Sequence, residues 1–592
     1  MTTDLADGGQ GAAPRLAAGK GFAAVMAGAA VCGFCAGALG QPAWQVAVET
    51  AQVLGGAVSY PPGNPFGLYH AKLWTLSHQV LAPLLAAGVT ERTLSILLSG
   101  ALGAVAFMAF AAMAFALSGD WLAGAGAPLV VYYAGAAANG VVYPVLTLGT
   151  SHTYGSLGLS FAMLAVGALG AGRTRSGAFL LGLAPAAHPS VGAWVFLAVC
   201  LAVAAGRDRA RTFRRGAPWL AAGACVAALS LGVHLLAAPA PPVVDAAMEA
   251  RCLRAFEANW DAHRAPAPVL TRGGGLNAAC VAVCLCWLFR GRERLSGAVA
   301  LLLRTLVAAA AVGAAGAVVS WLPPGLAPRV LTTLMPARML NAAAFSFMAL
   351  AVGLLGAERS PLWLAGWLAA ALLVLRQTGP SGVAWAMMAA APVLCWRARA
   401  AARPERAGVP AGGRAALARL ALAALLCFVL AQSARKAWRL GAEAWPALCD
   451  RTNDAFFAAA AQGCGMVAPG PGVWLAQLRT RRPMLLDACA LDILPYAPAG
   501  GPEMERILRG VYGVSLFSPP PGMRPAAVIP EQPTRALWES RRPEEWRRVA
   551  EAFGFTAVMT LAGWRLNLPV TASGGGFTLY AIPPRAAESA RP

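Results

Sequence analysis

The sequence predicts a mainly α-helical membrane protein: a polytopic transmembrane helical bundle of about 13 spans with a small C-terminal α/β domain. Of the 592 residues, 58% are hydrophobic and only 12% are charged. Soluble globular chains carry about 25% charged residues, so the composition indicates a membrane protein. The apolar residues also gather in runs of roughly 20, the length that a helix needs to cross a bilayer.

Thirteen apolar runs are interpreted as spans, and the first is predicted to remain as a helix because it lacks a convincing signal-peptide cleavage site. Pro185 and Pro189 separate two short runs, which fit either a tight pair of helices or one broken helix. The expected spans are residues 20–40, 92–118, 121–148, 155–171, 176–189, 190–206, 218–238, 275–290, 297–321, 337–356, 360–377, 380–397 and 414–433.

The basic residues indicate which side of the membrane each turn faces. The net charge of +21 is almost entirely arginine, and it lies in short runs between apolar segments instead of one patch, so nucleic acid is not an expected partner. With the N-terminus inside, most inside turns are basic, as the positive-inside rule requires. These turns hold Arg173 and Arg175, then the arginines of 207–215, 290–294 and 397–406.

Thirteen spans that start inside leave the C-terminus outside. The abundance of Ala, Gly and Arg is typical of a GC-rich bacterial genome, so the predicted location is the bacterial inner (cytoplasmic) membrane, with the C-terminus in the periplasm. The chain then divides into a cytoplasmic tail (1–19), a transmembrane domain (20–433) with periplasmic loops 41–91 and 239–273, and a periplasmic α/β domain (434–592). Residues 71–88 are expected to form a helix at the membrane interface.

The C-terminal domain alternates strand-like runs (472–478, 557–562 and 577–582) with helical runs (503–513 and 543–554). Its cysteines, Cys449, Cys464 and Cys489, would permit one disulfide in an oxidising compartment, and the sequence does not indicate which pair. The single CxxC motif has no second pair, so no structural zinc is expected.

The histidines gather on one side of the predicted topology. All six lie in outside loops or near the outer ends of spans: His70, His78, His152, His188, His234 and His263. Titratable groups at the edge of an apolar bundle are costly unless they are used or paired. The sequence therefore predicts a polar cavity that opens outward.

Glu49 is the only carboxylate between Asp7 and Glu91, and it follows the first span in a mildly apolar setting. A half-buried carboxylate there would have a raised proton affinity, which suits a general base. The alternative interpretations are an N-terminal charge of an interfacial helix, or a salt bridge to Lys72.

His152 and His188 lie in short polar segments between apolar runs. They are candidates for relaying protons or binding substrate hydroxyls, and structural capping of a helix is the alternative. Glu49 and the two histidines lack close metal-ligand spacing, so no metal site is assigned and a divalent metal is left open. Arg338 lies at the outer entrance of the tenth span. Its guanidinium could bind the phosphate of a substrate there, and the alternative is that it only reaches ordinary lipid headgroups.

The architecture resembles the GT-C superfamily of integral-membrane glycosyltransferases, and residues 546–558 and 577–580 are similar to the helix and strand near the end of many such enzymes. The resemblance implies transfer of a sugar from a polyprenyl-phosphate-linked donor on the periplasmic face. Glu49 takes the place of the family's first-loop acidic residue. The family usually has an Asp close after the first span, whereas this sequence has a lone Glu further along the loop. Arg338, with Arg329, takes the place of the phosphate-binding arginine, and His70, Lys72, His152 and His188 are candidates for binding the substrate.

Two other functions fit the same features. A transporter or flippase of a lipid-linked saccharide also needs an outward cavity, but inverted repeats or midplane charges are expected of it and are not evident. A non-catalytic assembly subunit would use the C-terminal domain for docking. Membrane lipids are expected partners in every case, and the sequence does not identify the sugar, the acceptor or the oligomeric state.

Overall fold

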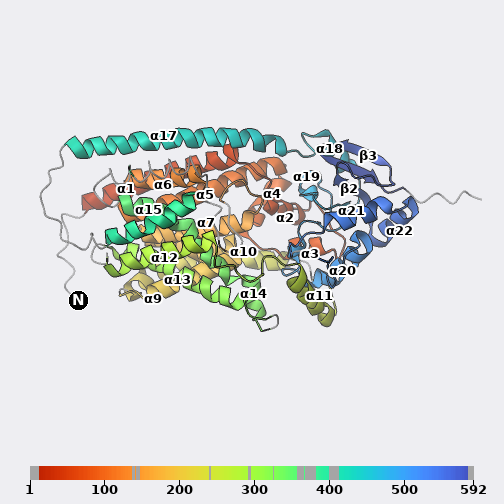
Figure 1. The fold of residues 1–592 in the computed structure, drawn as a ribbon, viewed down its shortest axis with the longest axis horizontal. Helices are drawn as coiled ribbons and strands as arrows, with labels where there is room; N and C mark the ends of the chain where they lie inside the picture. The colour runs from red at the N-terminus through yellow and green to blue at the C-terminus, as the bar shows by residue number, and fades with distance from the viewer. Residues whose placement is uncertain are drawn as a thin grey trace, which may run out of the picture.

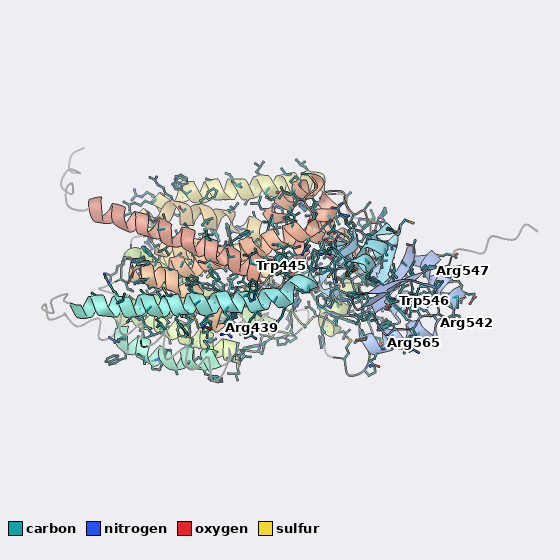
Figure 2. All side chains as sticks on the ribbon, turned by 90° about the horizontal axis from the view of Figure 1, so that it is seen from above. Arg439, Trp445, Arg542, Trp546, Arg547 and Arg565 are labelled. Atoms are coloured by element: carbon teal, nitrogen blue, oxygen red, sulfur yellow. The ribbon has the colours of Figure 1, made fainter. Side chains whose placement is uncertain are left out.

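The computed structural model describes residues 12–135, 141, 147–207, 209–238, 240, 242–290, 295–323, 326–356, 366, 382–398, 413–523 and 525–583. Figure 1 shows a bundle of roughly parallel helices with the C-terminal domain at one end and the start of α1 at the other. The long helix α17 (Gly413–Ala444) runs along the bundle and leads into this domain. Trp445 follows it (Figure 2) and donates from Nε1 to the Leu39 carbonyl at 3.1 Å.

The protein is a multi-pass membrane protein, because several helices are long and apolar enough to cross a bilayer. Within the described ranges there are eight: Gly21–Gly40, Glu91–Ser118, Thr153–Gly170, Arg209–Ala237, Arg272–Arg290, Gly297–Ser320, Arg329–Gly356 and Arg419–Ala447. Four further expected spans correspond to shorter helices: α6 (Trp121–Ala134), α8 (Thr174–Ala187), α9 (Pro189–Ala204) and Gly382–Ala398. Apart from residue 366, the expected span at 360–377 lies outside the described residues, so the number of about 13 stays a prediction.

The first span packs on α5 (Glu91–Ser118) through small residues. The first span comprises α1 (Ala12–Cys35) and a π-helical turn (Ala36–Gly40). A Cβ atom added to Gly33 would lie 2.3 Å from the Gly103 carbonyl oxygen, and one on Gly37 would lie 2.0 Å from that of Ser99. The two backbones are therefore in direct contact, which is how membrane helices pack in the absence of large side chains.

The paired prolines produce a tight helical hairpin. His188 ends α8 and begins α9, and a Cβ atom on Gly192 would lie 2.4 Å from the backbone nitrogen of Pro185. The chain therefore reverses at His188, so the two short runs form a pair of helices and not one broken helix. The next helix, α10 (Arg209–Ala237), packs along α8.

Basic side chains mark the end of the bundle where the chain starts. The Arg173 guanidinium lies 5.0 Å from the ring centre of Phe22, early in the first span, and Arg175 lies 5.8 Å from that of Trp219. Figure 1 shows the C-terminal domain at the opposite end. This separation matches the pattern expected of a cytoplasmic and an outer face, and the sidedness itself stays a prediction.

The C-terminal domain contains a four-stranded sheet of order β1-β2-β4-β3. β1 (Met466–Pro469) pairs parallel to β2 (Phe555–Leu561), and β4 (Phe577–Ala581) pairs antiparallel to both β2 and β3 (Val570–Gly574). The expected strands at 557–562 and 577–582 are thus confirmed. The expected helices are also present, as α20 (Gly501–Ile507) with a π-helical extension (Leu508–Tyr512), and as α22 (Pro543–Phe553). The domain also contains α18 (Ala455–Gln462) and α21 (Glu531–Ser540).

The predicted strand at 472–478 is wrong. The strand ends earlier, at Pro469, and residues 476–480 form the short helix α19 (Ala476–Thr480). The reason is local: Gly472 has φ +83° and Leu475 has φ +54°, so the chain turns twice where an extended run was expected.

The core of the C-terminal domain is shared with both large loops. The first loop forms α2 (Val46–Leu54), α3 (Pro65–Lys72) and α4 (Leu76–Ala86), and the second forms α11 (Ala246–Asn259). The expected helix at 71–88 is thus divided between the end of α3 and α4. Phe66 of α3 and Phe256 of α11 are buried among the domain's own apolar side chains, as is Trp260. All 13 cysteines are free thiols, including Cys449, Cys464 and Cys489.

Candidate functional site

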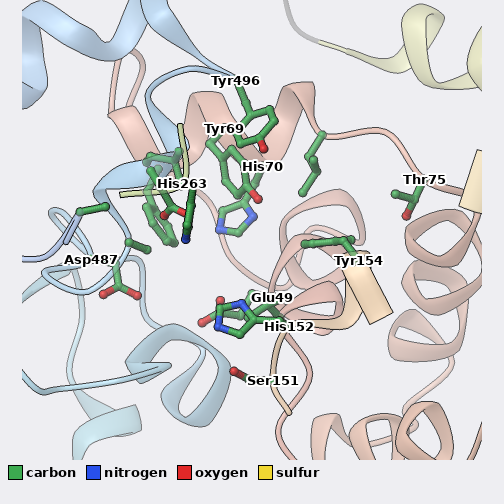
Figure 3. A pocket seen from close by; sticks show the side chains of 18 of the residues that line it. Glu49, Tyr69, His70, Thr75, Ser151, His152, Tyr154, His263, Asp487 and Tyr496 are labelled. Atoms are coloured by element: carbon green, nitrogen blue, oxygen red, sulfur yellow. The ribbon is translucent and has the colours of Figure 1, made fainter. Parts of the chain in front are cut away.

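A cavity of 560 Å³ lies where the bundle, both loops and the C-terminal domain meet (Figure 3). The first loop supplies Glu49 and His70, the helical bundle supplies His188 and Arg338, and the C-terminal domain supplies Asp487. Its size is that of a small-molecule site. The lining combines carboxyl, imidazole, guanidinium and aromatic groups, which is an unusual concentration of polar side chains for an apolar chain.

The structure brings together six of the seven residues that the sequence singled out. Glu49, His70, Lys72, His152, His188 and Arg338 all line the cavity. Arg329 does not: it begins α14 (Arg329–Leu334), its side chain is 58% exposed, and it lies 3.9 Å from Glu249. His263 also lines the cavity, so four of the six histidines do.

Glu49 is held in the first turn of α2 by a fixed polar framework. Gln45, the residue before the helix, donates to Ser99 Oγ (2.9 Å) and the Thr150 carbonyl (3.1 Å), and accepts from Thr153 Oγ1 (2.7 Å). Gln477 of the C-terminal domain donates to the Glu49 backbone carbonyl at 2.9 Å. The helix is therefore anchored to the bundle at its start and to the domain along its side.

The Glu49 carboxyl group is buried, and one of its oxygens has no partner in the part of the chain that the structure describes. The residue is 3% exposed, and its Oε1 has no hydrogen-bond partner among the described residues. The salt bridge to Lys72 that the sequence left open is not formed, since Lys72 is exposed at the end of α3. Burial, reinforced by the nearby charge of Asp487, raises the pKa of Glu49 well above its usual value, and the Leu478 backbone opposes this only in part.

Asn64 positions α3 and its cavity residues. Its Oδ1 caps the helix by accepting from the backbone of Phe66 (2.9 Å) and Gly67 (3.0 Å), and Pro65 provides the first helical residue. Its Nδ2 donates to the Leu485 carbonyl at 2.9 Å, two residues before Asp487. One side chain thus holds the His70 helix against the segment that carries Asp487.

A buried hydrogen-bonded chain runs behind the cavity wall. His70 Nδ1 lies 2.9 Å from Thr50 Oγ1, which lies 3.2 Å from the Tyr154 hydroxyl, which lies 2.9 Å from His78 Nε2. Burial, with repulsion from His78, lowers the pKa of His70 to about 3. The His70 ring is therefore neutral and binds hydroxyl groups as donor or acceptor without carrying charge.

The helical bundle contributes an arginine to the cavity lining. Arg338 lies in a 3₁₀ turn (Pro336–Met339) that leads into α15 (Leu340–Gly356), and Trp194 of α9 donates to the nearby Leu334 carbonyl at 2.9 Å. His188 begins α9, and its Nδ1 accepts from the Val191 backbone at 3.4 Å. His188 therefore caps α9, which was one of the two interpretations of this residue, and its ring also lines the cavity.

The sequence interpretation missed the contribution of the C-terminal domain. Asp487, Asp492 and Tyr496 all line the cavity, and His263 Nδ1 lies 3.2 Å from Asp492 Oδ2. A signal was available: both aspartates interrupt an otherwise apolar run at 484–494. Among the residues that the structure describes, no group of three His, Cys, Asp or Glu side chains is arranged to hold a metal ion.

A buried ion cluster joins the domain to the bundle. Glu91, the first residue of α5, is ion-paired with Arg481 and lies 3.5 Å from Arg451, both from the C-terminal domain. Gln52 of α2 donates to the same carboxylate at 3.2 Å. Because this cluster links the first loop, the helical bundle and the C-terminal domain, it fixes their relative position.

Replacing Glu91 with Gln is expected to weaken this attachment by about 1–3 kcal/mol, because two arginines lose a charged hydrogen-bond acceptor. Thermal unfolding in detergent should shift to lower temperature, and limited proteolysis near residues 445–455 should become faster. Glu503→Gln is the matched control, since its ion pair with Arg506 is largely exposed and contributes little. Equal stability of the two variants would contradict the anchoring role.

No protein-family model matches the chain, and no curated protein matches it in sequence. The fold and the site define a multi-pass membrane protein with a buried, carboxyl- and histidine-lined cavity beside its C-terminal domain. Its function is therefore argued from the chemistry of that cavity.

Proposed function

We propose that the protein is a glycosyltransferase of the bacterial inner membrane, which transfers a sugar from a polyprenyl-phosphate-linked donor to an acceptor on the periplasmic face. One observation carries the proposal: the buried carboxyl group of Glu49, whose Oε1 has no partner among the described residues, shares a cavity with the guanidinium of Arg338. A glycosyl phosphate donor needs both, since a base must take the acceptor's proton and a cation must receive the leaving phosphate.

In the proposed mechanism, Arg338 binds the donor phosphate through parallel hydrogen bonds. The carboxylate side of the cavity accepts the proton of the acceptor hydroxyl, the hydroxyl oxygen attacks the anomeric carbon, and the bond from that carbon to the phosphate oxygen breaks. Arg338 opposes the charge that develops on the phosphate. His152, His188 and the neutral His70 orient sugar hydroxyls, and Lys72 lies at the exposed margin of the cavity. Arg329, outside the lining, has no role in this mechanism.

The proposal is tested by incubating the purified full-length protein, in bilayer discs and in sealed vesicles, with radiolabelled polyprenyl-phosphate sugars and a panel of hydroxylated acceptors. The expected result is transfer of label from the lipid to the acceptor. Movement of the intact labelled lipid across the vesicle membrane without transfer would support a flippase instead. If neither transfer nor movement were observed, the proposal would be contradicted and the assembly-subunit function would remain.

A further inference from the structure

Asp487 occupies a built position in the C-terminal domain. The chain before it runs parallel to β1, with the Leu485 backbone donating to the Val467 carbonyl at 2.8 Å, and Asp487 follows where this extended segment ends. The residue is 4% exposed, and its Oδ1 accepts from the Cys489 backbone at 2.8 Å. In the described ranges no lysine or arginine forms an ion pair with it.

A buried carboxyl group without a cation is expensive, so its position needs a reason. Asp487 lines the same cavity as Glu49, and Figure 3 draws both among the side chains that line it. The two carboxyl groups come from distant parts of the chain, and the polar contacts of Asn64 and Gln477 hold those parts together. The fold therefore places two buried acids, neither of them in an ion pair among the described residues, at one cavity.

The two acids affect each other's ionisation. The charge of Asp487 is the second cause, after burial, of the raised pKa of Glu49. Burial, with repulsion from Asp492, raises the pKa of Asp487 to about 7, against the opposing Cys489 backbone contact. Asp487 interacts with the acidic groups of Glu49, Asp492, Cys489, Tyr60 and Tyr512. His70, His152 and His263 line the same cavity. The pair of acids loses its protons in steps that belong to both residues.

We infer that Asp487 is a second catalytic carboxyl group of the cavity that Glu49 lines, so that the C-terminal domain completes the transfer site. This inference rests on the proposed function. It gives the domain a chemical role, in place of the docking role expected of an assembly module.

The proton balance of the transfer step follows. Before reaction the pair carries one proton and one negative charge. It accepts the hydroxyl proton of the acceptor as the oxygen–carbon bond forms and the carbon–phosphate oxygen bond breaks. The pair is then neutral with two protons, the electron pair of the broken bond leaves with the lipid phosphate, and the extra proton is later released to water.

The test measures sugar transfer by the full-length protein and four variants: Asp487→Asn, Glu49→Gln, the double variant and Asp450→Asn. Asp450 is the matched control, because it is a buried aspartate of the same domain outside the cavity lining. Asp487→Asn should lower turnover ~10²-fold or more. The double variant should be about as slow as the slower single variant, because residues that act as one unit are not additive.

The pH profile separates chemistry from folding. Wild-type turnover should fall as the pH drops through about 7, where the pair becomes fully protonated. This acid limb should move in Asp487→Asn and stay in place in Asp450→Asn, and Asp487→Glu should recover part of the turnover. If Asp487 had only a structural role, the Asp487→Asn variant would be slower at every pH and the acid limb of its pH profile would not move.

Two failures are distinguishable. Absence of transfer by the wild type from every donor would overturn the proposed function itself. The role of Asp487 alone would be overturned if the wild type transfers sugar and Asp487→Asn turns over within about threefold of it. It would also be overturned if the losses of the two single variants multiply in the double variant.

Discussion

Glu49→Gln is expected to lower the turnover of sugar transfer by ~10²–10⁴-fold, the usual contribution of general-base assistance. The amide has the size of the carboxyl group but cannot accept the acceptor's proton. Because Glu49 Oε1 has no partner among the described residues, the substitution breaks no ion pair that holds the fold. The apparent affinity for the donor should change little, since the loss occurs in the transition state.

The measurement is single-turnover transfer from a radiolabelled donor, accompanied by thermal unfolding of each variant. Glu257→Gln is the matched control: Glu257 lies on α11 at the same end of the molecule and does not line the cavity. Near-wild-type turnover of a folded Glu49→Gln protein would remove Glu49 from the mechanism. A large loss in the Glu257 variant would show that the assay responds to general damage at this end.

Arg338→Gln is expected to lower kcat/KM for transfer by ~10²–10³-fold, as the loss of a transition-state anion donor does in other enzymes. Arg338→Lys keeps the charge but loses the planar fork that binds two phosphate oxygens, so it should recover only part of the rate. The half-buried position of Arg338 at the cavity makes both effects specific to the site.

Steady-state kinetics over a range of donor concentrations check this prediction. Arg254→Gln serves as the control, because Arg254 is exposed on α11 outside the cavity lining. If Arg338 only reached lipid headgroups, both its variants would transfer sugar like the wild type and would differ from it only in membrane partitioning.

Much of the site was predictable because a polar residue is conspicuous in an apolar chain. Glu49, His152 and His188 interrupt long hydrophobic stretches, and such residues are costly unless the fold gives them polar surroundings. The same reasoning fails in the C-terminal domain, where charged residues are common. Asp487 became significant only when tertiary structure buried it against the first loop.

Arg329 shows where distance along the chain misleads. It precedes Arg338 by only nine positions. Between them, however, α14 ends at Leu334, and the next residue, Met335, turns the chain with a φ of 44°, so the two side chains have different surroundings. The strand predicted at 472–478 failed for a similar local reason. Backbone turns of this kind are set by packing that a hydrophobic pattern does not record.

The shared core of the C-terminal domain was equally hidden. Sequence composition separates the two loops from this domain, yet Phe66 and Phe256 are buried inside it. Long-range packing of this kind decides which loop residues face one another, and it creates the cavity from four separate parts of the chain.

Electron cryo-microscopy of the Glu49→Gln protein loaded with a polyprenyl-phosphate sugar tests most directly whether this cavity is the transfer site. The phosphate density should lie against Arg338, with the sugar in the cavity and its anomeric carbon facing residues 49 and 487. An ordered donor bound elsewhere on the protein, with the cavity empty, would contradict the assignment.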